Sequence, residues 1–416
     1  MRLESWAATD QGRTRKNNED HYYLAPDLGL MAVADGMGGF DRGEVASELA
    51  CSVLRETISA QRATLSAFGA HPSPEKRLAV LDLMQAAIQK ACFQVHAAAS
   101  ALSASGRMGT TLDVVLIIKQ TAFIAHVGDG RIYLCRKGEV HQLTDDHSLI
   151  AEQLREGAIT PDQARRARNR SVITRALGAF PSVLVDTLDF QLDAGDSLII
   201  CSDGLHRYIG PRELGFTLEE SKGQTAATAL IELANSRGGR DNITVVICNT
   251  LPDASTEEPS LVNARRMDAL RKVDLLASCT YKELMAIRLI TAVRKLPAGH
   301  TLFSDGDQGR ECFFIEQGEV RIEKDGHLLS VLGPGSAFGE MSFLDFPRRS
   351  ATAIIASDAS LLTMHRDRFI QLLKQDPELG VKLSWQLLKK LSRIVRRTNE
   401  QLVSESVPLT DERARS

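Results

Sequence analysis

Residues 33–40 read VADGMGGF, and this stretch decides how the first half of the chain is interpreted. An apolar run, LGLMAV at 28–33, ends at Asp35, and three of the next four residues are glycine. The run predicts a buried strand, because it is short, apolar and bounded by Gly and Asp. Gly36 permits an unusual backbone angle and lets its own carbonyl approach a cation, while Gly38 and Gly39 keep side chains away. The stretch therefore predicts a cation site at a strand end.

Other carboxylates follow the same pattern of an apolar strand beside glycine or a small polar residue. They are Asp129 in VGDGR, Asp203 in CSDGL, Asp241 in GGRDN, and the pair Glu19 and Asp20 in NNED. One Asp-Gly alone is typical of a turn. Gathered carboxylates repel by about 4 kcal/mol at about 4 Å and an effective dielectric near 20, so protons or metal must neutralise them. Oxygen ligands without His or Cys favour Mg²⁺ or Mn²⁺ over zinc, and two such ions can activate a water and polarise a phosphoryl oxygen.

A phosphate ester hydrolase also needs an anchor for phosphate. In TDQGRTRKNNED, Arg15 precedes Glu19 and Asp20 by four and five residues. Arginine can hold a phosphate through two parallel hydrogen bonds. The alternative is a surface arginine that pairs with a neighbouring acid.

The composition narrows the class of protein. The 416 residues are too many for one core, so at least two domains are expected. A net charge of −3 gives no general attraction to nucleic acid or anionic membranes. The N-terminus lacks the apolar region of a secretory signal, no run of about 18 apolar residues occurs, and the scattered cysteines contain no C-x-x-C. We therefore expect a cytoplasmic protein that binds neither membrane nor nucleic acid.

A polar stretch with two prolines, at 249–263, is the expected domain boundary. Before it, apolar strands alternate with helices expected at 43–60, 74–104, 145–157, 160–168 and 223–236. After a short helical stretch at about 264–290, frequent Gly-containing turns predict short strands in a compact β-sandwich or barrel. The chain ends in a helix with leucines at roughly helical spacing.

Eight motifs in the first region resemble those of one family. TDxGxxRxxNED, VADGMGG, GTT, VGDGR, LTDDHS, ITRALG, SDGL and RDNIT occur in the order found in metal-dependent protein phosphatases, the PPM or type 2C serine/threonine class. The resemblance covers about 1–250. It implies an α+β fold, an αββα antiparallel β-sandwich, with the metals at one sheet end.

The resemblance also implies roles for individual residues. The implied metal ligands are Asp35, which bridges two ions, Asp203 and Asp241 at the first ion, Gly36 with Glu19 and Asp20 at the second, and Asp129 at a third, weaker ion. Arg15 matches the phosphate-binding arginine, and 152–178 resembles the flap beside the active site. Met37 departs from many eukaryotic members, which carry a His that protonates the leaving oxygen, so a water held by a metal is the alternative acid. His126 and His147 are expected to be structural.

The second region carries a different cassette, GSAFGEMSFLDFPRRSATAII at 335–355. A helix that starts near 338–340 would point free N–H groups at an anion, and Arg349 would add a full charge. Glu340 could accept a hydrogen bond from a sugar hydroxyl. The alternative is a turn with a surface acid and a surface arginine.

This cassette, with LPAGHTLFSDGDQGRECFFIEQGEVRI before it, resembles a cyclic nucleotide-binding domain of the catabolite activator and cyclic-nucleotide-dependent kinase type, over about 270–400. The resemblance implies a β-roll with flanking helices that binds cAMP or cGMP. Glu340 corresponds to the ribose acceptor and Arg349 to the phosphate partner, with Arg348 as a rival. The cradle would be completed by Phe338, Gly339, Met341 and Ser350. No helix-turn-helix signature follows, which argues against a transcription factor.

Together these patterns predict a phosphatase domain at 1–250, a linker at 251–263, a cyclic nucleotide-binding-like domain at 264–405 and a disordered tail at 406–416. The expected function is metal-dependent hydrolysis of phosphoserine and phosphothreonine in proteins, regulated by a cyclic nucleotide and opposed by a cognate kinase. The alternatives are a second domain that only docks or dimerises through its C-terminal helix, and an inactive phosphatase that serves as a nucleotide-gated binding module.

Overall fold

The structure is a computed structural model of the whole chain, and it describes residues 1–38, 42–102, 108–167, 172–252, 266–340 and 348–405. The chain divides into two compact units, Met1–Ser260 and Leu261–Ser416, which are described separately. Most of the predicted linker and the whole predicted tail lie outside the described residues. No helix in the described part of the chain is long and apolar enough to cross a membrane.

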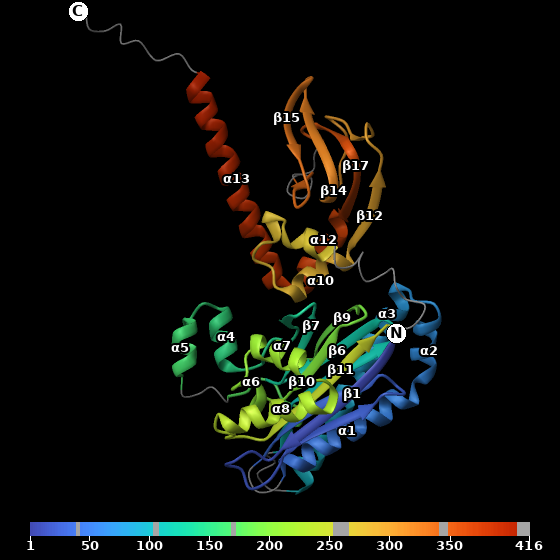
Figure 1. Cartoon of the computed structure of the whole chain (residues 1–416), viewed down its shortest axis with the longest axis vertical. Helices are drawn as coiled ribbons and strands as arrows, with labels where there is room; N and C mark the ends of the chain where they lie inside the picture. Colours follow the sequence, from blue (N-terminus) through green and yellow to red (C-terminus); the bar gives the residue numbers. More distant parts are fainter. Residues whose placement is uncertain (39–41, 103–107, 168–171, 253–265, 341–347, 406–416) are drawn as a thin grey trace, which may run out of the picture. The chain divides into compact units, whose positions relative to one another are not determined.

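The first unit contains two antiparallel sheets (Figure 1). One sheet has the order β1 (Arg2–Asp10), β11 (Ile243–Leu251), β10 (Ser197–Cys201), β7 (Arg131–Arg136) and β8 (Glu139–Gln142). The other has the order β2 (Asp20–Ala25), β3 (Leu30–Met37), β5 (Leu112–Ile118), β6 (Thr121–Val127) and β9 (Asp186–Gln191), with β4 (Gly109–Thr110) paired to β3. The predicted site residues lie at or next to the ends of several of these strands.

Helices cover the outer face of each sheet. The β3-containing sheet is covered by α1 (Gly43–Ala60), α2 (Arg62–Ala70) and α3 (Pro74–Leu102). The β11-containing sheet is covered by α6 (Asp203–His206), α7 (Pro211–Glu220) and α8 (Gly223–Ser236). The flap holds α4 (Leu149–Arg155) and α5 (Pro161–Arg166). This is the predicted αββα sandwich.

The strands of the sandwich are buried on both faces, which explains their continuous apolar runs. In β3, Leu30 and Ala32 pack against the helices, whereas the alternate residues Met31 and Val33 are also buried but point to the other face. That other face meets the second sheet, because β3 contacts β10 and β11. An isolated sheet with one wet face would instead alternate apolar and polar residues.

The predicted elements match the structure with local exceptions. The helices expected at 43–60 and 223–236 have those bounds, and the helix expected at 74–104 ends at Leu102. The helix expected at 145–157 starts only at Leu149, because Ser148 is extended and its Oγ accepts from Ala151 N as the N-cap (3.3 Å). The helix expected at 160–168 is α5, which begins in a Thr160–Gln163 capping box and ends where Ala167 becomes extended.

The second unit is built on one antiparallel sheet. Its order is β12 (Thr291–Leu296), β17 (Thr352–His365), β14 (Glu311–Lys324) and β15 (His327–Leu332), with β13 (Thr301–Phe303) on β17 and β16 (Ala337–Phe338) on β14. Helical residues 266–271, η1 (Asp274–Leu276) and α10 (Tyr281–Leu289) precede it, and α12 (Arg366–Gln375) and α13 (Pro377–Glu405) follow it. Phe313, Ile315 and Leu361 lie in its core. The unit is the predicted β-roll with flanking helices.

Candidate functional site

The predicted carboxylates lie at the ends of strands from both sheets of the first unit. Asp20 and Asp35 are register partners on β2 and β3. Asp203 begins α6, two residues after β10, and Asp241 precedes β11 by two residues. Asp129 lies in the turn between β6 and β7. The sandwich thus brings together acidic residues that are up to about 220 positions apart in sequence.

Electrostatics shows that these carboxylates form one cluster. Burial raises the pKa of Asp35 well above its usual range, and repulsion from Asp20, Asp203, Asp129 and Asp241 raises it further. Burial is also the main reason that the pKa of Asp20 and that of Asp203 each rise to about 7, and neighbouring carboxylates add to it. The cluster therefore carries excess negative charge that a cation would relieve.

The residues of this cluster fit a divalent cation. Asp20 Oδ1 and Asp203 Oδ1 are buried and lack a hydrogen-bond partner. Such orphaned oxygens are the hard ligands that Mg²⁺ and Mn²⁺ prefer. In the described residues, however, no three acidic, His or Cys side chains already form a metal cage. The carboxylates of Asp203 and Asp241 are instead held by arginines.

Glycines allow the backbone to approach closely beside Asp35. A Cβ on Gly36 would lie 2.1 Å from the carbonyl oxygen of Gly43 and 2.5 Å from that of Glu19. A Cβ on Gly43 would lie 2.6 Å from Glu19 Oε1. The two glycines therefore keep the Glu19 carboxylate next to the Gly36 backbone. The close backbone approach predicted at Gly36 is present and also requires Gly43, which was not singled out from the sequence, whereas Gly36 does not have a positive φ.

Arg15 lies at the rim of the cluster. Its Nη2 is 2.8 Å from Asp241 Oδ1 and 3.0 Å from Oδ2, and its side chain is 49% exposed. The hydrogen bond to Asp241 is the main cause that raises the pKa of Arg15. The arginine is thus paired with an acid, as one interpretation of the sequence held, and also faces solvent from which a phosphate can arrive.

A second arginine, Arg207, was not predicted as part of this site. Its Nη2 forms an ion pair with Asp203 Oδ2, and its Nη1 is 3.8 Å from Asp241 Oδ2. Arg207 is the C-cap residue of the short helix α6, and its spacing of four residues from Asp203 brings the two side chains together. The spacing of four residues was the sequence signal for Arg207. It indicates a contact with Asp203 only if a helix starts at that aspartate.

Neutral side chains hold the cluster in place. Thr111 Oγ1 accepts from the backbone N–H of Asp35 (2.9 Å), and Ser202 Oγ donates to Asp20 Oδ2 (2.7 Å). Asn242 Oδ1 accepts from Glu19 N (2.9 Å), while its Nδ2 donates to the carbonyl oxygens of Gln11 (2.9 Å) and Asn17 (2.8 Å). Asn242 directly follows Asp241 in the chain, so these bonds fasten the loop that carries Arg15 beside Asp241.

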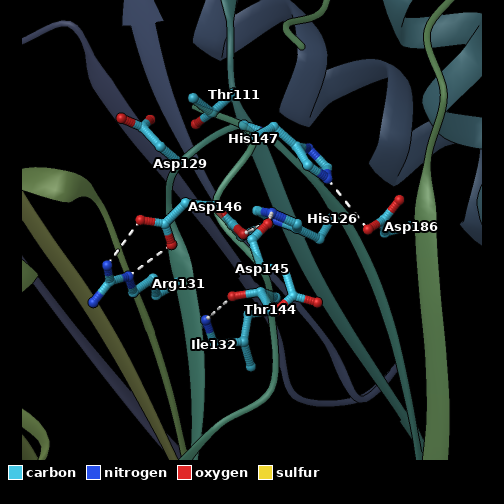
Figure 2. A network of polar contacts seen from close by, with 12 residues as sticks. Thr111, His126, Asp129, Arg131, Ile132, Thr144, Asp145, Asp146, His147 and Asp186 are labelled. Carbon is cyan, nitrogen blue, oxygen red and sulfur yellow. Dashed lines mark hydrogen bonds and ion pairs between the residues drawn. The ribbon is translucent and has the colours of Figure 1, made fainter. Parts of the chain in front are cut away.

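Figure 2 shows the polar network beside Asp129. His126 Nδ1 bonds the buried Asp113 (2.6 Å), and His147 Nε2 lies 3.2 Å from Asp186. Gly128 N donates to His147 Nδ1 (3.1 Å), and His147 N donates to Gly128 O (2.8 Å). Both imidazoles are thus engaged in packing strands and turns, in agreement with the structural role expected for them.

A pocket of about 570 Å³ adjoins this network. The residues that line it include Asp129 and Arg207, and also Ile150 and Leu154 of α4.

Met37 is the last residue of β3 and pairs with Gly109. Its thioether cannot donate a proton, so the residue supplies no acid to a leaving group.

In the second unit, Arg349 is buried and faces its own pocket of about 310 Å³. Its guanidinium lies 4.1 Å above the centre of the Phe303 ring, and Nη1 donates to the carbonyl oxygens of Glu311 (2.9 Å) and Gly339 (3.3 Å). Its Nε has no hydrogen-bond partner. A Cβ on Gly309 would lie 2.2 Å from that Nε, so the glycine leaves room for the guanidinium.

The other predicted residues of this cassette are placed differently. Glu340 is buried and forms an ion pair with Lys390 of α13, which the sequence did not predict. Phe338 stacks on Phe313 in the core (5.2 Å between ring centres). Ser350 and the rival Arg348 are exposed, and Met341 lies outside the described residues. Of the polar pair, Arg349 lines a pocket while Glu340 is held by an internal cation.

Family profiles match both units. The profile of "Protein phosphatase 2C" matches residues 12–238, and that of "Cyclic nucleotide-binding domain" matches residues 293–376. The chain is 35% identical over 243 residues to the serine/threonine phosphatase stp of Listeria welshimeri, which covers 58% of this chain and 92% of that protein. It is also 35% identical over 250 residues to the protein phosphatase PhpP of Streptococcus pneumoniae, covering 59% of this chain and 96% of that protein.

Solved structures agree with these matches. The serine/threonine phosphatase PstP/Ppp of Mycobacterium tuberculosis superposes with a TM-score of 0.54 at 33% identity, over 61% of this chain and 100% of that chain. The catalytic domain of PstP in complex with two manganese ions superposes with a TM-score of 0.50 at 32% identity, over 60% of this chain and 99% of that chain. The chain thus belongs to the protein phosphatase 2C family and is a metal-dependent protein serine/threonine phosphatase with a C-terminal cyclic nucleotide-binding domain.

Proposed function

We propose that the first unit hydrolyses phosphoserine and phosphothreonine in proteins with two divalent ions, Mn²⁺ or Mg²⁺, held by its buried carboxylate cluster. The observation that carries this proposal is the set of carboxylates that raise one another's pKa values beside the half-exposed Arg15. The related phosphatase solved with two manganese ions supports the number and kind of ion.

The residues that would hold the ions are those that the family resemblance implies. Asp35 would serve both ions, Asp203 and Asp241 would hold the first, and the Gly36 carbonyl would hold the second, with Glu19 and Asp20 acting through water. The chemistry that bound ions would supply is a water of lowered pKa for attack on phosphorus and polarisation of a phosphoryl oxygen. Thr111 and Asn242 keep the ligands in position by holding the Asp35 and Glu19 backbones.

Arg15 is proposed to bind the phosphate of the substrate. Its guanidinium can donate two parallel hydrogen bonds to phosphate oxygens, and its partial exposure lets a phosphorylated side chain reach it. Asp241 holds the guanidinium at the rim before substrate arrives. A phosphoprotein made by a cognate Ser/Thr kinase in the cytoplasm is the proposed substrate.

The test is turnover of p-nitrophenyl phosphate by the full chain in Mn²⁺ and in EDTA. Wild-type protein should turn over only with metal, and Asp203→Ala should abolish the rate. Asp82→Asn, an exposed acid on α3, is the matched control and should keep it. Equal rates in wild type and Asp203→Ala would overturn the proposed role of the cluster.

We further propose that the second unit binds a cyclic nucleotide and thereby alters the phosphatase rate. The support is Arg349, which is buried, faces a pocket and has a nitrogen without a partner. Coupling between a ligand site and an active site is typically about 1–3 kcal/mol and is reciprocal in binding. Calorimetry with cAMP and cGMP tests this: heat that is lost in Arg349→Ala supports a sensor.

One observation favours a docking role instead. Lys390 already holds Glu340, and α13 exposes Val381, Trp385 and Leu388 on its outer side. Such a face fits a second copy of the same helix, because 381, 385 and 388 follow a heptad-like 4–3 spacing. No heat with either nucleotide, together with a dimer that Trp385→Ser dissociates in light scattering, would support this alternative.

A further inference from the structure

Arg207 occupies the side of the cluster where the resemblance implies a third metal. It is the C-cap residue that directly follows α6, and its N–H donates to the carbonyl oxygen of Asp203 (3.0 Å). Its side chain turns back to pair with Asp203 and reaches Asp241. It also lines the same pocket as Asp129. A guanidinium is therefore already placed among three of the predicted ligands.

Asp129 is buried and lines the same pocket as Arg207 and Asp146. Asp129 Oδ1 is buried without a hydrogen-bond partner, so no donor offsets the negative charge at that oxygen. The backbone carbonyl of Asp129 is bonded by His206 Nε2 (2.8 Å), which helps to fix the turn.

The other carboxylates near Asp129 do not offer the oxygen ligands that a divalent ion needs. Asp146 is held by Arg131 through two hydrogen bonds of 2.8 Å each, so its oxygens are engaged (Figure 2). Asp203 gives its Oδ2 to Arg207 and keeps only Oδ1 without a partner. An ion beside Asp129 would meet the charge of Arg207, which lines the same pocket, and the only open oxygen of Asp203 is Oδ1, the oxygen proposed for the ions of the cluster. The third metal therefore does not fit this chain.

We propose that Arg207 replaces the third, weaker metal: its guanidinium is a built-in cation that balances Asp129 and Asp203. Unlike an ion, this charge does not depend on the metal concentration, and it is anchored by the helix that carries Asp203. Asp203 Oδ2 pairs with Arg207, which leaves Oδ1 as the oxygen that could bind an ion of the cluster. Arg207 is thus a positioning residue for a metal ligand.

This inference rests on the proposed two-ion centre, so the experiment measures how many Mn²⁺ ions bind to each chain. Mn²⁺ binding to the full chain is measured by calorimetry and by the paramagnetic resonance signal of free Mn²⁺. Wild type should bind two ions per chain and Arg207→Asp three, because the substitution removes a cation and adds a ligand. Arg207→Lys keeps the charge and should bind two. Arg212→Asp, the same charge change at an exposed site on α7, is the control and should bind two.

A second measurement separates this inference from the two-ion centre itself. In EDTA, Arg207→Ala should lower the Tm by about 3 °C or more relative to Arg207→Lys, because buried carboxylates lose their internal cation. Three ions on wild type, two on Arg207→Asp, or equal Tm values for the Ala and Lys variants would each overturn the role of Arg207. Absence of Mn²⁺ binding by wild type, with the Tm difference present, would overturn the two-ion centre alone.

Discussion

Asp20 of β2 lies directly opposite Asp35 of β3 in the antiparallel pair, and both side chains are drawn into the same carboxylate cluster. Like charges opposite each other on paired strands destabilise a sheet. The pair is retained beside buried apolar residues of β3 such as Ala32 and Val33, whose burial offsets the local cost. The opposed carboxylates make the stability of the metal-free protein sensitive to pH.

The first prediction concerns that sensitivity. The pKa values of Asp20 and Asp203 rise to about 7 in the folded protein, so between about pH 4 and pH 7 the folded state holds more protons than the unfolded state. The contribution of these two carboxyls to stability therefore falls as pH rises through this range. In EDTA, the Tm should fall by several degrees from pH 5 to pH 8, and Mn²⁺ should remove most of the fall. A Tm in EDTA that rises or stays constant would contradict this account.

The second prediction concerns the phosphate anchor. Arg15→Ala removes a charge-assisted pair of hydrogen bonds, typically about 1.5–3 kcal/mol, so kcat/KM for a phosphothreonine peptide should fall about 10- to 100-fold. Arg15→Lys keeps the charge but not the two-pronged geometry and should recover only part of the loss. Arg13→Ala, an exposed arginine of the same loop, serves as control. A loss of the same size in Arg13→Ala would show that the loop, and not the anchor, was disturbed.

The third prediction concerns His147, which joins the Asp129 turn to the far end of the flap. His147 exchanges two hydrogen bonds with Gly128, and its carbonyl oxygen accepts from Thr174 N (2.8 Å). His147→Ala leaves the Gly128 N–H without a partner, which costs about 1–3 kcal/mol of unfolding free energy. Chemical denaturation should show this loss, and limited proteolysis should cleave the flap faster. Unchanged stability and cleavage would show that His147 does not join these segments.

The fourth prediction concerns the ion pair between Lys390 and Glu340. If Glu340 accepts a hydrogen bond from the ribose, Lys390 competes for it, so Lys390→Met should tighten cyclic nucleotide binding about 3- to 10-fold by calorimetry. Lys389→Met is a matched control, because that lysine is exposed and lies 5.7 Å above the Trp385 ring. Weaker binding by Lys390→Met would mean that the lysine helps to hold the ligand.

The sequence predicted the carboxylate cluster because each member lies at a strand end, where the sandwich geometry gathers side chains. It predicted α1 and α8 because their apolar positions keep helical spacing. It did not predict Arg207 or Asn242 as parts of the site, since their roles depend on which segments meet. The pairing of His126 with Asp113 likewise requires the register between β5 and β6, which no local pattern encodes.

The second unit shows the same limit. Turn signals and the cassette at 335–355 predicted a β-roll, and Arg349 is buried at a pocket as a phosphate partner should be. The contact from Lys390 to Glu340 spans 50 residues and comes from a helix whose sequence shows only leucine spacing. Long-range ion pairs of this kind cannot be derived from a motif.

The most direct test measures phosphate release from a phosphothreonine peptide by the full chain against Mn²⁺ concentration, with and without cAMP or cGMP. The account predicts no release in EDTA, a rate that saturates with Mn²⁺, and a change of about 5-fold or more in that rate with one of the nucleotides. A chain that releases no phosphate at any Mn²⁺ concentration would contradict the metal-dependent mechanism. A metal-dependent rate that neither nucleotide alters would contradict the proposed regulation.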